Sequence, residues 1–292
     1  MRPLESVPNF SEGRNRQTIE AIGRALARHA RLLDVHSDVD HNRSVFTLVG
    51  DDAGIVAGLV DAVAVARDRI DLATHEGAHP LIGAADVVPV VPLAPEDMER
   101  AKDAAREAAR RIGAELAVPV FLYGELAAGR GPAFFRRGGR ETLQARIDAG
   151  ELEPDFGPPR LDTRAGGVIV GARRPLIAFN VNLRGVGVEV AREIAATIRE
   201  RGGGFPGVRA LGLELPTAGV VQVSMNVEDW EAAALHEIVD RVAAEASARG
   251  AEIVESELVG LMPAGAAAAA AGAQLGIRGF DASRVLELRL LE

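Results

Sequence analysis

The sequence predicts an α/β protein of the α+β type, in which two related split βαβ subdomains surround a ligand cleft. Short runs rich in Val, Leu and Ile alternate with longer segments of helical periodicity, which is typical of helices that cover a sheet. Aromatic residues make up only 4% of a chain that is 48% hydrophobic, so the core must consist mostly of Ala, Val, Leu and Ile. The order β-α-β-β-α-β occurs twice along the chain.

The first copy of this order lies in the N-terminal half. Ile19, Ile22 and Leu26 recur on one helical face, and an acidic cap opens the next helix. Prolines in the run at 85–93 suggest an edge strand or a strand end. The predicted strands are 4–10, 31–37, 44–50, 85–93 and 118–124, and the predicted helices are 16–30, 51–70 and 95–116.

Residues 124–168 are rich in Gly, Pro and Arg and show no period, so we expect a long connecting loop there. The second copy of the order follows this loop. Its predicted strands are 175–183, 208–215, 220–227 and 252–261, and its predicted helices are 188–201 and 230–250. We therefore expect an N-terminal subdomain over 1–172 and a C-terminal subdomain over 173–292, with the binding site in a cleft between them.

Composition limits the function classes. A net charge of -9 and a pI near 5.3 disfavour a nucleic-acid binder, because phosphate neutralisation needs a concentrated basic face. Without cysteine, the chain has no disulfide framework, thiolate metal site or thiol nucleophile. The N-terminus lacks the apolar run of a signal peptide, so we expect a cytoplasmic protein that acts on small molecules and not on a membrane. A homodimer is compatible with the apolar second half.

One short stretch, THEGAHPLIGAAD at 74–86, contains the spacing H-E-x-x-H of zinc proteases. That motif works on a helix, where two histidines share one face and bind one metal. Gly77 and Pro80 disfavour a helix here, and Pro80 pushes His79 toward an extended conformation. A shaped loop before a strand, in which a histidine performs acid/base chemistry, is the preferred interpretation.

A second polar cluster, DVHSDVDHNRSV at 34–45, lies between two predicted strands. It places Asp38, Asp40, His41, Asn42 and Arg43 together, more titratable groups than a turn requires. A purely structural hairpin, in which Asp40 and Asn42 serve the turn geometry, is the alternative.

Together these residues resemble the formiminotransferase domain family. The matching stretches, in order from about residue 7 to about 264, are VPNFSEGRN, DHNRSVFTLVG, H-x-G-x-H-P-x-x-G-A-x-D at 75–86, VPVFLYG, PDFGP, IVGAR, LIAFNVNL, VQVSMN and ELVGL. The resemblance implies two α/β subdomains around a cleft. It also implies transfer of a formimino group from N-formimino-L-glutamate to tetrahydrofolate, a step of histidine degradation. Some animal relatives carry a further cyclodeaminase domain, for which this chain is too short.

The resemblance also implies roles for particular residues. The family's catalytic histidine falls on His79, and its folate-contacting segment falls on the loop that holds Gly157, Pro158 and Gly166. His79 would take the proton from the folate nitrogen and return one to the departing glutamate nitrogen. Asp40 is a candidate to orient that imidazole, and Arg43 is a candidate to bind a substrate carboxylate. The remaining predicted contacts are Asn9, Asn42, Gly83 and Asp86 for the substrate, and Asn180 and Asn182 for tetrahydrofolate, the co-substrate; no metal is expected.

The chain departs from the family pattern at two positions. It has Ala78 and Leu81 where the family usually has Glu and Arg, so two opposite charges are missing together. This loss removes either a structural ion pair or the grip on a dicarboxylate. Two alternatives therefore remain: a divergent or non-catalytic folate-binding relative that uses a different one-carbon donor, and a zinc hydrolase built on HEGAH.

Overall fold

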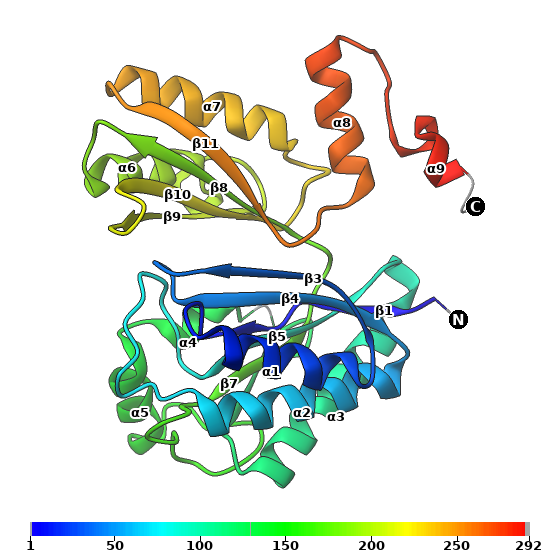
Figure 1. Ribbon diagram of the computed structural model, residues 1–292, viewed down its shortest axis with the longest axis vertical. Helices are drawn as coiled ribbons and strands as arrows, with labels where there is room; N and C mark the ends of the chain where they lie inside the picture. Colours follow the sequence, from blue (N-terminus) through cyan, green and yellow to red (C-terminus); the bar gives the residue numbers. More distant parts are fainter. Residues whose placement is uncertain (1, 129, 290–292) are drawn as a thin grey trace. The chain divides into compact units, whose positions relative to one another are not determined.

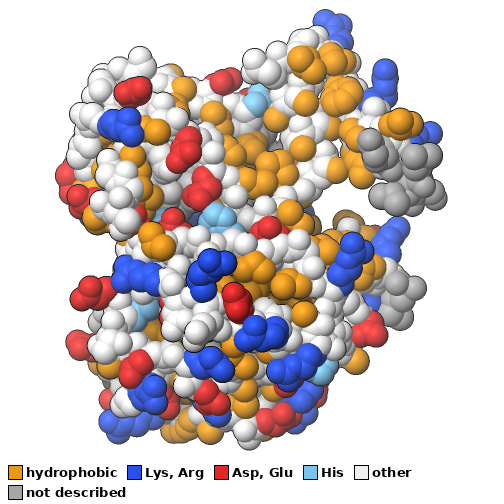
Figure 2. Space-filling view, in the orientation of Figure 1, with side chains coloured by type: hydrophobic (Ala, Val, Ile, Leu, Met, Phe, Trp, Pro, Cys, Tyr) orange, Lys and Arg blue, Asp and Glu red, His pale blue; other side chains and the backbone are white. Residues whose placement is uncertain are grey.

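The computed structural model describes residues 2–128 and 130–289. The chain separates into two compact units, Met1–Arg174 and Pro175–Glu292, and each builds its own sheet (Figure 1). Basic and acidic side chains are interspersed over the face drawn in Figure 2. Among the described helices, none is both long and apolar enough to cross a membrane.

The sheet of the first unit has an antiparallel part and a parallel extension. The antiparallel part has the order β3, β4, β1 with β2, and β5, and β7 and β6 add to β5 in parallel. Its strands are β1 (Leu4–Ser6), β2 (Asn9–Phe10), β3 (Arg31–Asp38), β4 (Arg43–Gly50), β5 (Ala85–Pro92), β6 (Val120–Gly124) and β7 (Val168–Ala172). Three helices lie along one side of this sheet (Figure 1): α1 (Arg16–Ala27), α2 (Asp52–Arg69) and α3 (Met98–Leu116), the last preceded by a 3₁₀ turn at Pro95–Asp97.

The prolines of 85–93 were expected to mark an edge strand or a strand end; Pro92 does end β5, but an edge position for this strand was wrong. β5 is buried along its whole length and pairs with β1 and β2 on one side and with β7 on the other. The predicted strand 4–10 is broken at Val7 and Pro8, and this break explains how a central strand accommodates Pro89. Ser6 pairs with Val90 and Asn9 with Val87, so Pro89, which has no N–H, lies opposite the break. The Ser6 hydroxyl donates to the Pro89 carbonyl at 2.6 Å.

The two faces of the first sheet have different cores. Alternate residues of the parallel strands, such as Val88 and Val90, join the core beneath the three helices. The intervening residues, such as Val87 and Ile169, join a second cluster on the other face. That second cluster is completed by two helices, α4 (Pro132–Arg136) and α5 (Gly139–Asp148). The prediction of one long connecting loop over 124–168 was therefore wrong for 132–148, which form these two helices, while 149–167 contain no helix or strand.

The second unit repeats the antiparallel arrangement. Its elements are β8 (Ile177–Arg184), α6 (Val188–Ile198), β9 (Val208–Leu215), β10 (Val220–Val227), α7 (Leu235–Ala248) and β11 (Glu252–Val259). The strand order β11-β8-β10-β9 matches the order β5, β1 with β2, β4 and β3 of the first unit. The predicted mixed α/β fold class, with two sheets and a repeated β-α-β-β-α-β order, is confirmed.

The helix expected from Trp230 begins later, at Leu235. Residues 229–233 form a turn, in which the Asp229 carboxylate accepts from the amide of Ala232 at 3.0 Å. Trp230 packs against the core of the second unit. The chain continues through α8 (Ala264–Leu275), a 3₁₀ turn at Ala282–Arg284 and α9 (Leu286–Arg289).

Candidate functional site

The HEGAH stretch lies in a loop that connects α2 to β5, and no residue from 71 to 84 is helical. Gly77 permits this loop to lie against the turn between β3 and β4, because a Cβ at this position would lie 2.4 Å from the carbonyl oxygen of His41. The expected shaped loop before a strand is thus confirmed. The helical geometry that a zinc protease needs is absent from this stretch.

The two polar clusters found in the sequence are joined by backbone contacts. The amide of Ala78 donates to the Asp40 carbonyl at 2.9 Å, and the Asn42 side-chain amide donates to the Glu76 carbonyl at 3.0 Å. Asn42 adopts a left-handed φ of 46° and also accepts from the amide of Gly13 at 2.9 Å. Asn42 therefore connects three segments and has a structural role, and its predicted substrate contact stays a prediction.

His75 takes part in the same junction. Its Nε2 lies 3.0 Å from the Asn42 carbonyl oxygen, so it is a structural residue of the loop. The predicted orienting role of the Asp40 carboxylate stays a prediction, although the Asp40 backbone does hold the loop.

The ring of His79 is half-buried, and its Nδ1 lies 2.8 Å from the Pro80 carbonyl oxygen. A carbonyl oxygen only accepts, so Nδ1 carries the proton of the neutral ring and Nε2 is left as the basic nitrogen. The centroid of the His41 ring lies 6.0 Å from that of His79. The acceptor that fixes the tautomer is thus a backbone carbonyl.

The pKa of the His79 imidazole lies well below its ordinary value of 6.5, first because of burial and then because of the positive charges of Arg43 and Arg136 and the neighbouring His41. The contact with the Pro80 carbonyl acts in the opposite direction and is smaller. At neutral pH the ring is therefore uncharged, which is the state in which Nε2 can accept a proton.

The charges beside His79 belong to a cluster centred on Asp86, whose side chain is fully buried. Oδ2 of Asp86 accepts from Arg43 Nη1 at 2.8 Å and from Arg136 Nη2, while Oδ1 accepts from the amide of Ile82 at 2.8 Å. Burial alone would raise the pKa of this carboxyl, but Arg136, Arg43 and the Ile82 amide outweigh it and lower the pKa. Nε of Arg43 donates to Asn9 Oδ1 at 3.0 Å.

Sequence reasoning missed Arg136. The expected connecting loop over 124–168 included this residue, whereas Arg136 ends α4 and reaches the buried carboxylate of Asp86. The adjacent pair Phe134 and Phe135 was the available signal, because two aromatic residues directly before an arginine indicate a segment that packs on the core. Asn9, a predicted substrate contact, is the acceptor for Arg43, and Asn15 caps α1.

Gly83 and Gly166 face each other in a backbone bridge that joins the end of the His79 loop to the predicted folate segment. A Cβ on Gly83 would lie 1.7 Å from the Gly167 carbonyl oxygen, and a Cβ on Gly166 would lie 2.1 Å from the Ile82 carbonyl oxygen. Gly166 also has a φ of 69°. Close packing therefore accounts for both glycines, and the predicted substrate and folate contacts remain predictions.

The other end of the predicted folate segment lies against different elements. Gly157 has a φ of 82°, and a Cβ there would lie 2.3 Å from the Val118 carbonyl oxygen. Pro158 is half-buried. These residues pack beside the start of β6, so the segment from 157 to 166 runs from that strand to the His79 loop.

Asn180 and Asn182 belong to the second unit, on the face of its sheet that is turned away from the core. They are buried, and their amide nitrogens donate to Glu257 at 2.9 Å and to Glu255 at 3.2 Å. The Gln222 amide donates to Asn182 at 2.9 Å. These side chains form a row of hydrogen bonds across the face of the sheet. The contact of Asn180 and Asn182 with folate remains a prediction.

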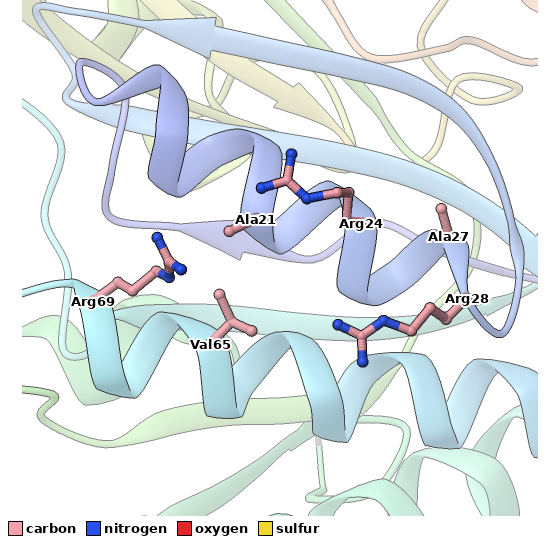
Figure 3. Close-up of a pocket in the computed structure, with 6 residues that line it drawn as sticks. All are labelled: Ala21, Arg24, Ala27, Arg28, Val65 and Arg69. Carbon is pink, nitrogen blue, oxygen red and sulfur yellow. The ribbon is translucent and has the colours of Figure 1, made fainter.

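A separate hollow lies between α1 and α2, lined by Ala21, Arg24, Ala27, Arg28, Val65 and Arg69 (Figure 3). Arg24 and Arg28 are exposed and lie 3.6 Å from Glu20 and Asp61, respectively. The hollow is on the helix-covered side of the sheet, opposite to Asn9 and Arg43. In the described part of the chain, no group of three or more acidic or histidine side chains is arranged to hold a metal ion.

Comparison with known proteins gives matches along nearly the whole chain. Residues 3–173 match the model for the formiminotransferase domain, N-terminal subdomain, and residues 178–275 match the model for the formiminotransferase domain. The glutamate formimidoyltransferase of Streptococcus pyogenes serotype M1 is 38% identical, with 99% of this chain and 98% of the relative covered. That of Thermoplasma acidophilum is 39% identical at the same coverage. The formimidoyltransferase-cyclodeaminase of Gallus gallus is 41% identical over 89% of this chain and 50% of its own length.

Proposed function

This chain belongs to the formiminotransferase domain family, and we propose that it is a glutamate formimidoyltransferase that transfers the formimino group of N-formimino-L-glutamate to tetrahydrofolate. Two relatives named glutamate formimidoyltransferase cover 99% of the chain, which supports this choice. The reaction forms a bond between the formimino carbon and a folate ring nitrogen. It breaks the bond between that carbon and the glutamate nitrogen.

His79 carries the proton in this proposal. Its Nε2 accepts the proton that the folate nitrogen loses on attack and donates one to the departing glutamate nitrogen, so the enzyme ends in its starting state. The observation that supports this role is the ring itself, with Nδ1 held by the Pro80 carbonyl and a lowered pKa that keeps Nε2 unprotonated at neutral pH. Histidine degradation is the route in which such a reaction releases glutamate.

The test is a comparison of wild type with His79→Ala in the presence of formiminoglutamate and tetrahydrofolate. We expect kcat to fall by at least about a hundredfold, the scale of lost general acid/base catalysis. His29→Ala is the matched control, because His29 is a surface residue paired with Asp61 at 2.9 Å. Equal loss in both variants, or no loss in His79→Ala, would contradict the assignment.

A divergent relative that uses another one-carbon donor is the second candidate. It is favoured by the pair Ala78 and Leu81, and Leu81 packs against the core of the first unit, where it offers no charge to a substrate. A wild-type protein that binds tetrahydrofolate but forms no formiminofolate would favour this candidate. The cytoplasmic location and the homodimer stay predictions. Sedimentation of the purified protein measures its oligomeric state.

A further inference from the structure

The cluster around Asp86 contains two guanidinium groups for one carboxylate. Arg43 and Arg136 both donate to Oδ2 of Asp86. Two positive charges and one negative charge leave these three side chains with a net charge of about +1. The side chains of Arg43 and Arg136 are only 9% and 16% exposed. Burial of a net charge is costly unless an anion compensates it, and a bound substrate carboxylate would do so.

The two arginines differ in which of their hydrogen-bond donors remain unused. Arg43 uses Nε for Asn9 and Nη1 for Asp86, so two of its three guanidinium nitrogens are already engaged. Arg136 contacts Asp86 through Nη2, and its buried Nε has no hydrogen-bond partner. A guanidinium with unused donors in a buried site is suited to bind a carboxylate in two places.

Arg136 is also positioned independently of the His79 loop. It is the last residue of α4, and its neighbour Phe135 is fully buried, with its ring centroid 5.3 Å from that of Phe121. The chain then turns through Gly138 and Gly139, both with a φ of 77°. Packing of Phe135 thus fixes the end of α4 and presents Arg136 to Asp86.

We propose that Arg136 is a specificity-determining residue that binds a carboxylate of the amino-acid donor. This inference rests on the proposed function. The donor carries its carboxylates a few bonds from the nitrogen that leaves, whereas those of tetrahydrofolate are separated from its reacting ring by the aminobenzoyl group. Arg136 is connected through Asp86 to the amide of Ile82, three residues after His79, so a carboxylate bound by Arg136 lies beside the His79 loop, where the reacting carbon of the donor has to be.

The test uses three donors: N-formiminoglutamate, N-formiminoglutamine, which lacks the γ-carboxylate charge, and N-formiminoisoglutamine, which lacks the α-carboxylate charge. Wild type is compared with Arg136→Gln, Arg136→Lys and the control Arg137→Gln, whose side chain is exposed. Rates are measured at pH 8, where His79 is neutral with or without Arg136. The melting temperature of each variant shows that it is folded.

We expect Arg136→Gln to lower kcat/KM for N-formiminoglutamate by about 10- to 100-fold, the scale of a lost hydrogen bond between charged groups. The preference of wild type for this donor over one of the two amides should disappear in that variant, and the amide concerned identifies the carboxylate. Arg136→Lys should retain part of the preference, because it keeps the charge without the planar fork. Arg137→Gln and the KM for tetrahydrofolate should stay within about threefold of wild type.

Two results would overturn the inference while leaving the proposed function intact. An active wild type whose Arg136→Gln variant loses rate equally with all three donors would show that Arg136 only holds Asp86. An Arg136→Gln variant in which only the KM for tetrahydrofolate rises would show that Arg136 binds the folate and not the donor. A folded wild type that transfers no formimino group to tetrahydrofolate would instead overturn the proposed function, and with it this inference.

Discussion

At the scale of single residues, the charges that act on the His79 ring are those of Arg43, Arg136 and His41. In many enzymes a carboxylate stabilises the protonated imidazole and raises its pKa. Here positive neighbours disfavour the protonated form, and the Pro80 carbonyl fixes the tautomer without adding a negative charge. This environment suits a group that must begin as a neutral base and release its proton again within one turnover.

The lowered pKa makes a prediction about pH. His79 is unprotonated at pH 7, and it gains a proton only when the pH falls through its lowered pKa, so the acid limb of kcat/KM should lie below pH 6.5. In Arg136→Gln the positive neighbour is gone, and the limb should move upward toward 6.5. Profiles of kcat/KM against pH for both proteins measure this, and a wild-type limb above 6.5 would contradict it.

Part of the site was predictable from the sequence, since His79, Arg43 and Asp86 lie in two dense polar stretches of unusual composition. The structure unites these stretches around one buried carboxylate. Arg136 was not predictable in this way, because it is 50 residues from Asp86 and no spacing rule relates a helix end to a distant strand. Likewise, the sequence suggested an acidic partner for His79, whereas the observed partner of Nδ1 is the next residue's carbonyl.

At the scale of elements, the segment formed by α4 and α5 behaves as a cover for one sheet face. Its apolar residues are too few and too widely spaced to show a period, but they complete a cluster with β5, β6 and β7. This is why periodicity failed at 124–168, while it succeeded for α1 and α2, whose N-termini are capped by Asn15 and Asp51. Pro89 suggested an edge strand because it lacks an N–H. The break between β1 and β2 that accommodates it lies in another part of the sequence.

Substitution of Phe135 tests this cover. Phe135→Ala should destabilise the protein by about 3–5 kcal/mol, because it removes a fully buried ring from a packed cluster. Phe134→Ala is the control, with a cost of about 1 kcal/mol, since Phe134 is 36% exposed and contacts Arg130, Arg146 and the edge of the Phe135 ring. Denaturant unfolding measures both, and similar losses for the two variants would contradict the assignment of α4 to the core.

The contact between Gly83 and Gly166 gives a second prediction for this scale. Gly83→Ala should cost about 3 kcal/mol and lower the melting temperature, because its Cβ would lie 1.7 Å from the Gly167 carbonyl oxygen and the two loops would separate. Gly131→Ala is the matched control, since it has a φ of -95° and no atom within 4 Å of its added Cβ. A Gly83→Ala protein as stable as the control would show that the loops do not need this close approach.

At the scale of the whole molecule, each unit has its own sheet and its own hydrophobic clusters, two in the first unit and one in the second. The described strands of each sheet come from one unit only, and both units use the same relative strand order. The repeat was predictable, because a β-α-β-β-α-β order leaves a clear pattern in the sequence. The two strands that extend the first sheet were harder to place, since β7 follows a segment that looked irregular.

Separate cores predict separate folding. A fragment that covers residues 1–174 and one that covers 175–292 should each show circular dichroism of a folded mixed α/β protein and a cooperative thermal transition. Spectra of the two fragments, summed and compared with that of the whole chain, measure this. Fragments that remain unfolded at every temperature would mean that each unit depends on the other for its stability.

The carboxylate of Asp86 is the place where three segments distant in the sequence are fastened at once. One oxygen receives the amide at the end of the His79 loop, and the other receives arginines from β4 and from α4. Most folds spread such anchoring over many weak contacts, so that no single loss is serious. In this protein the three contacts share one carboxylate, so Asp86→Asn would weaken the attachment of a strand, a helix and a loop together. A substitution at position 86 would therefore change the constraints on Arg43, Arg136 and Ile82 at the same time.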